Sequence, residues 1–240
     1  MAASAQSDWD IQCEWGGQGL AALAPLSDVV IIVDVLSFST CVEIAVSRGG
    51  LVFPFAWNDA RAEAFARDMG AVLAGPRGGA PFSLSPSSLL GVSPGTRLVL
   101  PSPNGATLSL EAPGPVLAGC LRNAAAVART AGAAGKRVLV LPAGERWPDG
   151  SLRPCLEDWL GAGAILDALS GPCSPEAETA RAAFRALRAD LPRVLHTCTS
   201  GRELVERAYT QDVDLAAALN VSDTVPVLRE GAYHSGSARR

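Results

Sequence analysis

Residues 29–48 read VVIIVDVLSFSTCVEIAVSR, and this stretch decides the fold. An unbroken β-branched run, 29–33, leads directly into one carboxylate, Asp34, and a short polar turn then precedes a segment with helical character. A continuous apolar run this short is typical of a strand that is buried on both faces, as in a parallel sheet. Asp34 then stands at the carboxyl end of the strand, where open α/β sheets bind their ligands.

The turn after Asp34 also predicts the start of a helix. Thr40 and Glu43 have the spacing of a capping box, with Thr40 as the N-cap. A helix N-terminus attracts anions such as phosphate, and a carboxylate beside a bound anion requires a cation between the two. We therefore expect a divalent metal ion and a phosphorylated substrate at this corner of the sheet.

The rest of the chain alternates between short apolar runs and helix-like segments. Strands are expected at 11–15, 51–55, 71–74, 97–100, 116–120, 137–141 and 224–228, and helices at 59–69, 124–131, 155–169, 175–189, 200–209 and 212–219. This alternation predicts an α/β fold with a largely parallel sheet, whose polar strand ends converge on one crevice. Pro54 favours the edge or the end of a sheet, Asn58 is a candidate helix cap, and 16–19 is expected to be a turn or a disordered entry.

Two long irregular segments interrupt the pattern, at 75–95 and 145–153. A loop of this length is usually functional or disordered. Arg77 is the charged residue of the first loop, and either a solvated arginine or an anion-binding arginine fits the sequence. Glu157 and Asp158 lie in the first turn of a predicted helix, where they serve either the helix dipole or a binding site.

Composition narrows the range of partners and locations. The formal net charge is −4 and the basic residues are scattered, so we expect binding neither to nucleic acid nor to a membrane. The six cysteines form no CxxC pair, and the N-terminus lacks the apolar core of a signal peptide, which together predict a cytoplasmic protein. We expect one domain over 1–240, with flexible tails at 1–10 and 232–240.

The motifs of several enzyme classes are missing. The sequence contains no G-x-S-x-G elbow, no G-x-x-x-x-G-K-[ST] loop and no G-x-G-x-x-G at a strand end, and both histidines, His196 and His234, lie late in the chain. The polar residues that remain are carboxylates, hydroxyls, asparagines and arginines. Oxygen ligands of this kind suit Mg²⁺, and the set as a whole suits phosphoryl transfer.

Five ordered blocks resemble one known family. VDVLSFSTCVEIA, LPSPNGAT, GCLRNAAAVA, LEDWLGAGAI and SGRELVERAYTQDV are similar to the signature blocks of the 2-phosphosulfolactate phosphatase (ComB) family, over about 29–228. The resemblance implies a three-layer α/β/α fold with a mostly parallel or mixed central sheet. It also implies a Mg²⁺-dependent phosphatase that removes phosphate from a phosphorylated 2-hydroxy acid such as 2-phosphosulfolactate, in coenzyme M biosynthesis.

The resemblance also implies roles for individual residues. Asp34, Glu157 and Asp158 match the acidic positions expected to bind Mg²⁺ and to carry catalysis, with either Asp34 or a metal-activated water as the attacking group. The expected substrate-binding residues are Ser39, Thr40, Arg77, Asn104, Gly105, Arg122 and Asn123. The expected substrate is a small phosphoester, and a homodimer is one assembly that we consider.

Two positions depart from the family pattern. Ser37 stands where the family often has an arginine, and Pro76 stands where it has a glutamate. These departures support a second hypothesis, in which the chain is a non-catalytic relative that binds a small acidic metabolite.

Overall fold

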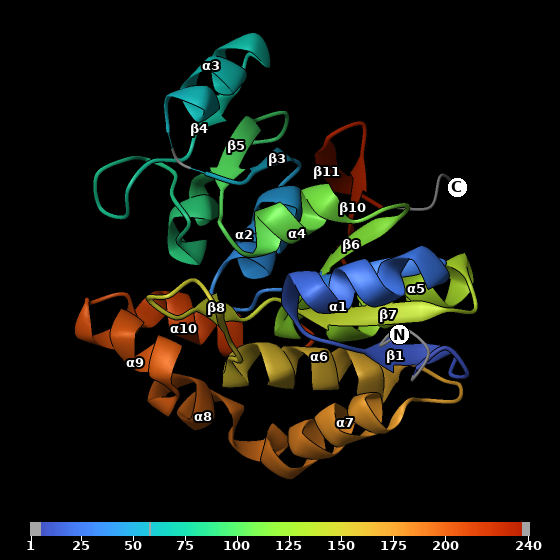
Figure 1. Cartoon of the computed structure of the whole chain (residues 1–240). Coiled ribbons are helices and arrows are strands. Elements are labelled where there is room, and N and C mark those ends of the chain that lie inside the picture. Colours follow the sequence, from blue (N-terminus) through green and yellow to red (C-terminus); the bar gives the residue numbers. More distant parts are fainter. Residues whose placement is uncertain (1–5, 58, 237–240) are drawn as a thin grey trace.

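A nine-stranded sheet forms the centre of the computed structural model, which describes residues 6–57 and 59–236 (Figure 1). In spatial order its strands are β1 (Ile11–Cys13), β7 (Val138–Pro142), β2 (Val29–Val33), β6 (Val116–Gly119), β10 (Pro226–Arg229), β11 (Ala232–Ser235), β3 (Leu51–Phe55), β5 (Arg97–Pro101) and β4 (Val72–Leu73). A separate hairpin pairs β8 (Glu145–Arg146) with β9 (Leu152–Arg153).

Strand β2 lies inside the sheet, parallel to β6 and β7 on its two sides. Its side chains alternate between two cores: Ile31 packs into the cluster on one face of the sheet, and Ile32 packs into the cluster on the other face. All five residues of the strand are buried. The prediction of a strand covered on both faces is therefore confirmed, and β2 carries Asp34 at its carboxyl end.

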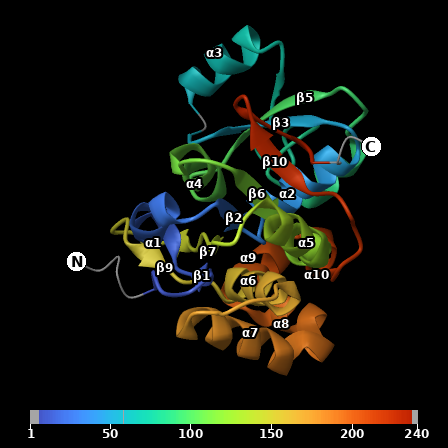
Figure 2. The same ribbon diagram turned by 90° about the vertical axis from the view of Figure 1, so that its right-hand side faces the viewer.

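Helices cover both faces of the sheet. One face is covered by α1 (Gly16–Leu23), α2 (Phe38–Ser47) and α4 (Gly105–Glu111), and the other by α5 (Ala124–Ala134), α6 (Leu156–Ala168), α7 (Pro175–Leu187), α8 (Leu191–Thr197), α9 (Thr199–Glu206) and α10 (Thr210–Ala217). Figures 1 and 2 show α6 and α7 below the sheet and α3 (Ala60–Asp68) at the opposite end of the molecule. This arrangement confirms the expected three-layer α/β/α fold.

The sheet is mixed because a hairpin, β10–β11, separates two parallel groups of strands. β10 runs antiparallel to β6, and β11 runs antiparallel to β3, so β3, β5 and β4 point opposite to β1, β7, β2 and β6. The expectation of a largely parallel sheet therefore holds only within each group, and the polar ends of β3 and β5 face the opposite direction to those of β2, β6 and β7. The segment after β5 nevertheless reaches Asp34, because Gly105 at the start of α4 donates to its carboxylate.

Four local predictions differ from the structure. Helix α1 replaces the expected turn at 16–19, and Ala232–Ser235 forms strand β11 where a tail was expected. The loop 145–153 contains the β8–β9 hairpin, and β3, which contains Pro54, has a neighbouring strand on each side. The expected tail segments 1–5 and 237–240 and the predicted helix cap at residue 58 lie outside the described residues. Asp59 caps α3 by accepting a hydrogen bond from the Arg61 N–H.

The expected capping box at Thr40 is also absent. Helix α2 begins at Phe38, and the backbone N–H of Phe38 donates to Asp34 Oδ1 at 3.0 Å. Glu43 points away from this helix start and pairs with Arg122. The carboxylate of Asp34, directly after β2, therefore takes the capping role that we predicted for Thr40.

No helix within the described residues is both long enough and apolar enough to cross a lipid bilayer.

Candidate active site

Asp34 joins the ends of two elements. Its Oδ1 accepts a hydrogen bond from the Phe38 N–H at the start of α2, and its Oδ2 accepts one from the Gly105 N–H at the start of α4, each at 3.0 Å. Gly105 lies so close that a Cβ there would be 2.8 Å from Asp34 Oδ2 and 2.5 Å from Phe38 Cδ1. The absence of a side chain at Gly105 therefore lets the backbone reach the carboxylate and fix its orientation.

The carboxylate of Asp158, in the first turn of α6, is also held by two backbone N–H groups. Its Oδ1 accepts from the Val35 N–H at 2.7 Å, and its Oδ2 accepts from the Gly144 N–H at 2.9 Å. Gly144 has a φ of +67°, a conformation that favours glycine. Asp158 therefore links helix α6 to the segments that follow β2 and β7. A residue that served only the dipole of its own helix would not need these two contacts.

Burial raises the pKa of both carboxyl groups. The pKa of Asp34 rises to about 6, because burial outweighs the stabilising backbone N–H groups of Phe38 and Gly105, and the charges of Glu145 and Glu157 add to the rise. The pKa of Asp158 is raised well above its ordinary value, first by burial and then by the charges of Asp34 and Glu157. Two buried carboxyl groups that disfavour each other's ionisation form a place where a cation stabilises the charged state.

Both carboxylates line one cavity of about 180 Å³. The charged residues that line it are Asp34, Glu145, Glu157, Asp158, Glu203, Arg77, Arg153 and Arg207. Its other walls are formed by Leu36, Ser37, Leu84, Asn104, Gly144, Cys155, Ser200 and Leu204. The structure thus brings together all three predicted acidic residues, together with Arg77 and Asn104.

Asn104 connects this cavity to a second one. Its Nδ2 donates to Glu145 Oε1 at 2.9 Å, and these two residues also line a neighbouring cavity of about 380 Å³ beside helix α1. The neighbouring cavity has Glu145 and Arg146 as its charged lining, whereas the smaller one gathers the carboxylates. The smaller cavity is therefore the candidate active site.

Cysteine thiols near Glu157 are poor nucleophiles. Cys198 Sγ donates to Glu157 Oε2 at 3.4 Å, and its pKa rises to about 12 because of burial and the nearby carboxylate. Burial and the same acidic neighbours raise the pKa of Cys155. Both thiols are therefore protonated at neutral pH and are poor candidates for the attacking group.

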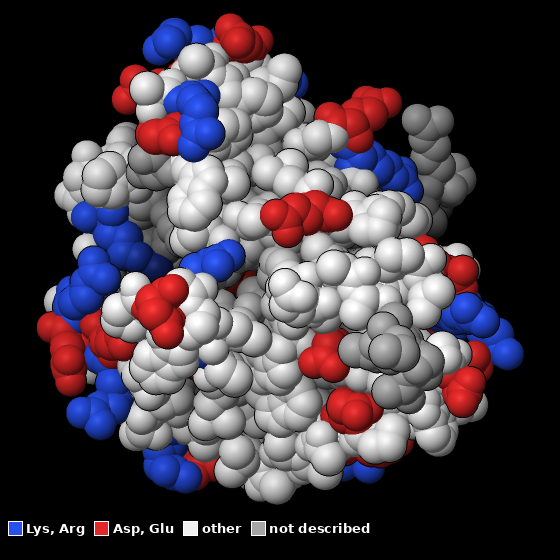
Figure 3. Space-filling view, in the orientation of Figure 1, with Lys and Arg blue, Asp and Glu red and all other residues white. Residues whose placement is uncertain are grey.

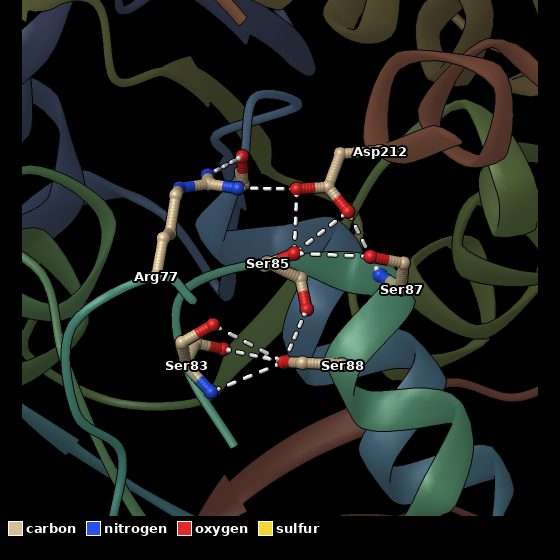
Figure 4. A network of polar contacts seen from close by, with 7 residues as sticks. Arg77, Ser83, Ser85, Ser87, Ser88 and Asp212 are labelled. Atoms are coloured by element: carbon tan, nitrogen blue, oxygen red, sulfur yellow. Dashed lines mark hydrogen bonds and ion pairs between the residues drawn. The ribbon is translucent and has the colours of Figure 1, made fainter. Parts of the chain in front are cut away.

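Arg77 is anchored by a residue that the sequence analysis did not single out. Its guanidinium pairs with the buried Asp212 of α10, donates to Ser37 Oγ at 2.9 Å, and lies 5.1 Å from the centre of the Tyr209 ring. Asp212 also accepts from Ser85 Oγ at 2.6 and 2.8 Å and from the Ser87 N–H at 2.9 Å (Figure 4). The loop at 75–95 is therefore ordered around one buried carboxylate, which holds Arg77 at the cavity.

Ser39 and Thr40 lie outside the cavity lining and serve the backbone. Ser39 Oγ accepts from the Asp34 N–H at 3.1 Å and donates to the Ile32 carbonyl at 3.0 Å. Thr40 Oγ1 donates to the Val35 carbonyl at 2.7 Å. Both side chains are fully buried, so they shape the turn and do not face a substrate in this cavity.

Arg122 and Asn123 are also placed away from the cavity. Arg122 pairs with the buried Glu43 at 2.6 Å and donates to the Leu215 carbonyl at 3.1 Å. Asn123 caps its own turn through the Cys120 N–H, at 2.9 Å, and its Nδ2 donates to two backbone carbonyls. Both residues stabilise the junction between β6 and its neighbours.

Four charged residues of this site were not predicted from the sequence. Glu145 lies three residues after the end of β7, at the start of β8, and had the signal of a polar strand end. Arg153 on β9, Glu203 on α9 and Arg207 after α9 had no local signal, because only the folded chain brings the hairpin and this helix to the cavity.

The donor set fits an ion that needs few protein ligands. No three His, Cys, Asp or Glu side chains stand close enough to hold a metal ion by themselves, within residues 6–57 and 59–236. Mg²⁺ is usually bound by one or two carboxylates, with water and phosphate oxygens completing its shell. Asp34 and Asp158, two buried and backbone-fixed carboxylates on one cavity, fit this requirement.

Comparison with known proteins identifies the family of the chain. The chain matches the family model described as 2-phosphosulpholactate phosphatase over residues 20–231. It is 31% identical to the 2-phosphosulfolactate phosphatase of Methanothermobacter thermautotrophicus, covering 85% of this chain and 88% of that protein. It is 30% identical to the probable 2-phosphosulfolactate phosphatase of Carboxydothermus hydrogenoformans, covering 88% and 91%. The chain therefore belongs to the 2-phosphosulpholactate phosphatase family.

Proposed function

We propose that the chain is a Mg²⁺-dependent phosphatase that hydrolyses 2-phosphosulfolactate or a closely related phosphorylated 2-hydroxy acid. The observation that carries the proposal is the pair of buried carboxylates, Asp34 and Asp158, whose four oxygens are fixed by backbone N–H groups on one cavity. Family membership and the names of both relatives support the substrate class.

The proposed division of roles follows from the contacts. Asp34 and Asp158 would hold Mg²⁺, with Glu157 beside them on the same cavity. Bound Mg²⁺ would neutralise the charge that develops on the phosphoryl oxygens. Asn104 and Arg77 would donate hydrogen bonds to phosphate oxygens, a role supported by the cavity position and the N–H donors of both side chains.

Two routes to phosphate release remain open. In the first, an Asp34 oxygen attacks phosphorus, the 2-hydroxy acid leaves, and water then hydrolyses the aspartyl phosphate. In the second, water attacks phosphorus directly. Acid-quenched single-turnover reactions and the stereochemistry at phosphorus separate the two: a phosphorylated Asp34 with net retention of configuration supports the first route, whereas no phosphoenzyme, with inversion of configuration, supports the second.

The competing hypothesis is a non-catalytic relative that binds an acidic metabolite. Its basis is Ser37 and Pro76, but Ser37 Oγ accepts a hydrogen bond from Arg77, so the turn after Asp34 is still linked to a cation. Assays over a panel of phosphorylated 2-hydroxy acids, with Mg²⁺ or with chelator, discriminate the hypotheses. Turnover that depends on Mg²⁺ supports the phosphatase, and binding without turnover supports the relative.

We also infer a cytoplasmic location and retain the homodimer as a prediction. All six cysteines are unpaired and buried, which suits a reducing compartment. Sedimentation analysis of the purified chain measures its oligomeric state.

A further inference from the structure

Two arginines at the candidate active site, Arg153 and Arg207, form no ion pair within the described residues. Arg77 is matched by Asp212, and Arg122, outside the cavity, is matched by Glu43. Arg153 and Arg207 line the cavity, and neither has a carboxylate partner among the residues that the structure describes. These two side chains therefore have positive charge available for a ligand.

Uncharged groups hold both arginines in place. Arg153 is half-buried, donates to Ser200 Oγ at 3.4 Å, and lies 5.8 Å from the centre of the Trp147 ring. Arg207 lies 5.7 Å from the centre of the Tyr209 ring, which Arg77 also contacts. A hydroxyl or an aromatic face orients a guanidinium without cancelling its charge, so each group is prepared for an anion.

The charges on the cavity divide into two kinds. Asp34, Glu157 and Asp158 are its buried carboxylates, which take phosphate only through a cation. The arginines come from the β8–β9 hairpin and the end of α9, and two less buried carboxylates lie near them. Glu145, which accepts from Asn104, is opposite Arg153 in the hairpin, and Glu203 is one helical turn before Arg207. Figure 3 shows basic side chains gathered between α9 and the loop after β4, with acidic side chains next to them. A small substrate with a phosphate and a second acid group has a complementary partner for each end.

We propose that Arg153 and Arg207 bind the carboxylate or sulfonate of the substrate and so select phosphoesters that carry a second acid. This inference rests on the proposed function for the nature of the substrate. Guanidinium groups bind carboxylate and sulfonate oxygens through paired N–H donors, which gives both charge and geometric selection.

Binding measurements on the full-length chain test this assignment. Isothermal titration calorimetry with 3-sulfolactate, the dephosphorylated product, and separately with inorganic phosphate plus Mg²⁺, compares wild type with Arg153→Gln and Arg207→Gln. Each variant should weaken 3-sulfolactate binding on the order of 10- to 100-fold and change phosphate binding less than about threefold. Arg202→Gln is the matched control, since Arg202 is an exposed residue of α9 that lies off the cavity.

Several outcomes overturn the assignment. The assignment is wrong if both variants bind 3-sulfolactate as tightly as wild type does, or if wild type does not bind 3-sulfolactate. It is also wrong if the variants lose phosphate binding as much as 3-sulfolactate binding, because the arginines would then bind the phosphate. The proposed function fails separately: wild type that binds 3-sulfolactate through these arginines but hydrolyses no phosphoester leaves the present inference intact. Circular dichroism of each variant distinguishes lost binding from lost folding.

Discussion

Arg77 and Asp212 form an ion pair across 135 residues of sequence, and the Asp212 side chain in this pair is completely buried. The pair links the loop after β4 to helix α10 and holds a cation at the candidate active site. Because Asp212 also anchors Ser85 and Ser87, its charge orders the loop as well as the arginine.

Asp212→Asn should therefore lower both stability and activity. Removing one partner of a buried pair leaves Arg77 without its counter-charge, so we expect the free energy of unfolding to fall by about 3 kcal/mol, and kcat/KM to fall on the order of tenfold. Asp214→Asn, on the exposed side of the same helix, should change neither quantity. In an Arg77→Met background, Asp212→Asn should cost little further activity, and an equal loss in both backgrounds would contradict a role through Arg77.

Asp158→Asn tests whether this residue serves the site or only the start of α6. An amide cannot accept from both Val35 and Gly144 with its two ends, and it removes a charge from the cavity. We expect kcat to fall on the order of 100-fold, which corresponds to about 2.7 kcal/mol of barrier. Asp167→Asn, on the same helix but paired with Arg185 at the surface, should retain activity. Activity within a few-fold of wild type for Asp158→Asn would restore the helix-only interpretation.

Gly105→Ala should misplace Asp34. The added Cβ would lie within 2.5 Å of Phe38 Cδ1 and 2.8 Å of Asp34 Oδ2, so the start of α4 must move away from the carboxylate. We expect destabilisation of about 1–3 kcal/mol and an activity loss on the order of 100-fold. Gly132→Ala, in helix α5 with open space around it, should instead stabilise the protein by about 0.5–1 kcal/mol. Denaturant unfolding and steady-state kinetics measure both variants, and equal behaviour would refute the steric argument.

The raised pKa of Asp34 predicts a pH dependence of stability in the presence of chelator. The folded state binds a proton at Asp34 up to about pH 6, whereas the unfolded state releases it near 3.8, so this contribution decreases stability as pH rises between these values. Relative to wild type, Asp34→Asn should become more stable by about 2 kcal/mol as the pH is raised from 4 to 8. Urea unfolding at several pH values measures this difference, and a constant difference would show that Asp34 has an ordinary pKa.

Local patterns were sufficient to predict most of the fold. The β-branched run 29–33 predicted a doubly covered strand, because only such a strand buries apolar residues on both sides without alternation. Strand β11 and helix α1 were missed, because His234 and the glycines at 16 and 17 give neither segment a clear apolar period. The reversal of β3, β5 and β4 depends on the β10–β11 hairpin at the end of the chain, which no nearby residue signals.

The candidate site was only partly predictable for a similar reason. Asp34 directly follows strand β2, and Asp158 lies in the first turn of helix α6. At both places a charged residue adjoins an apolar segment, and this contrast is visible in the sequence. Arg122 and Asn123 have the same signal, yet they pair with Glu43 and with backbone groups, because a polar strand end can also serve the fold. The sequence around Arg153 and Arg207 resembles that of ordinary solvent-exposed segments. Only tertiary packing brings these two side chains to the cavity.

The most direct test is phosphate release from 2-phosphosulfolactate by the purified wild-type chain, measured with Mg²⁺ and with excess chelator, with Asp34→Asn as the reference. Our account predicts turnover that requires Mg²⁺, is lost on chelation, returns when Mg²⁺ is restored, and falls by at least about 100-fold in Asp34→Asn. Absence of turnover with Mg²⁺, or turnover that survives both chelation and Asp34→Asn, would contradict it.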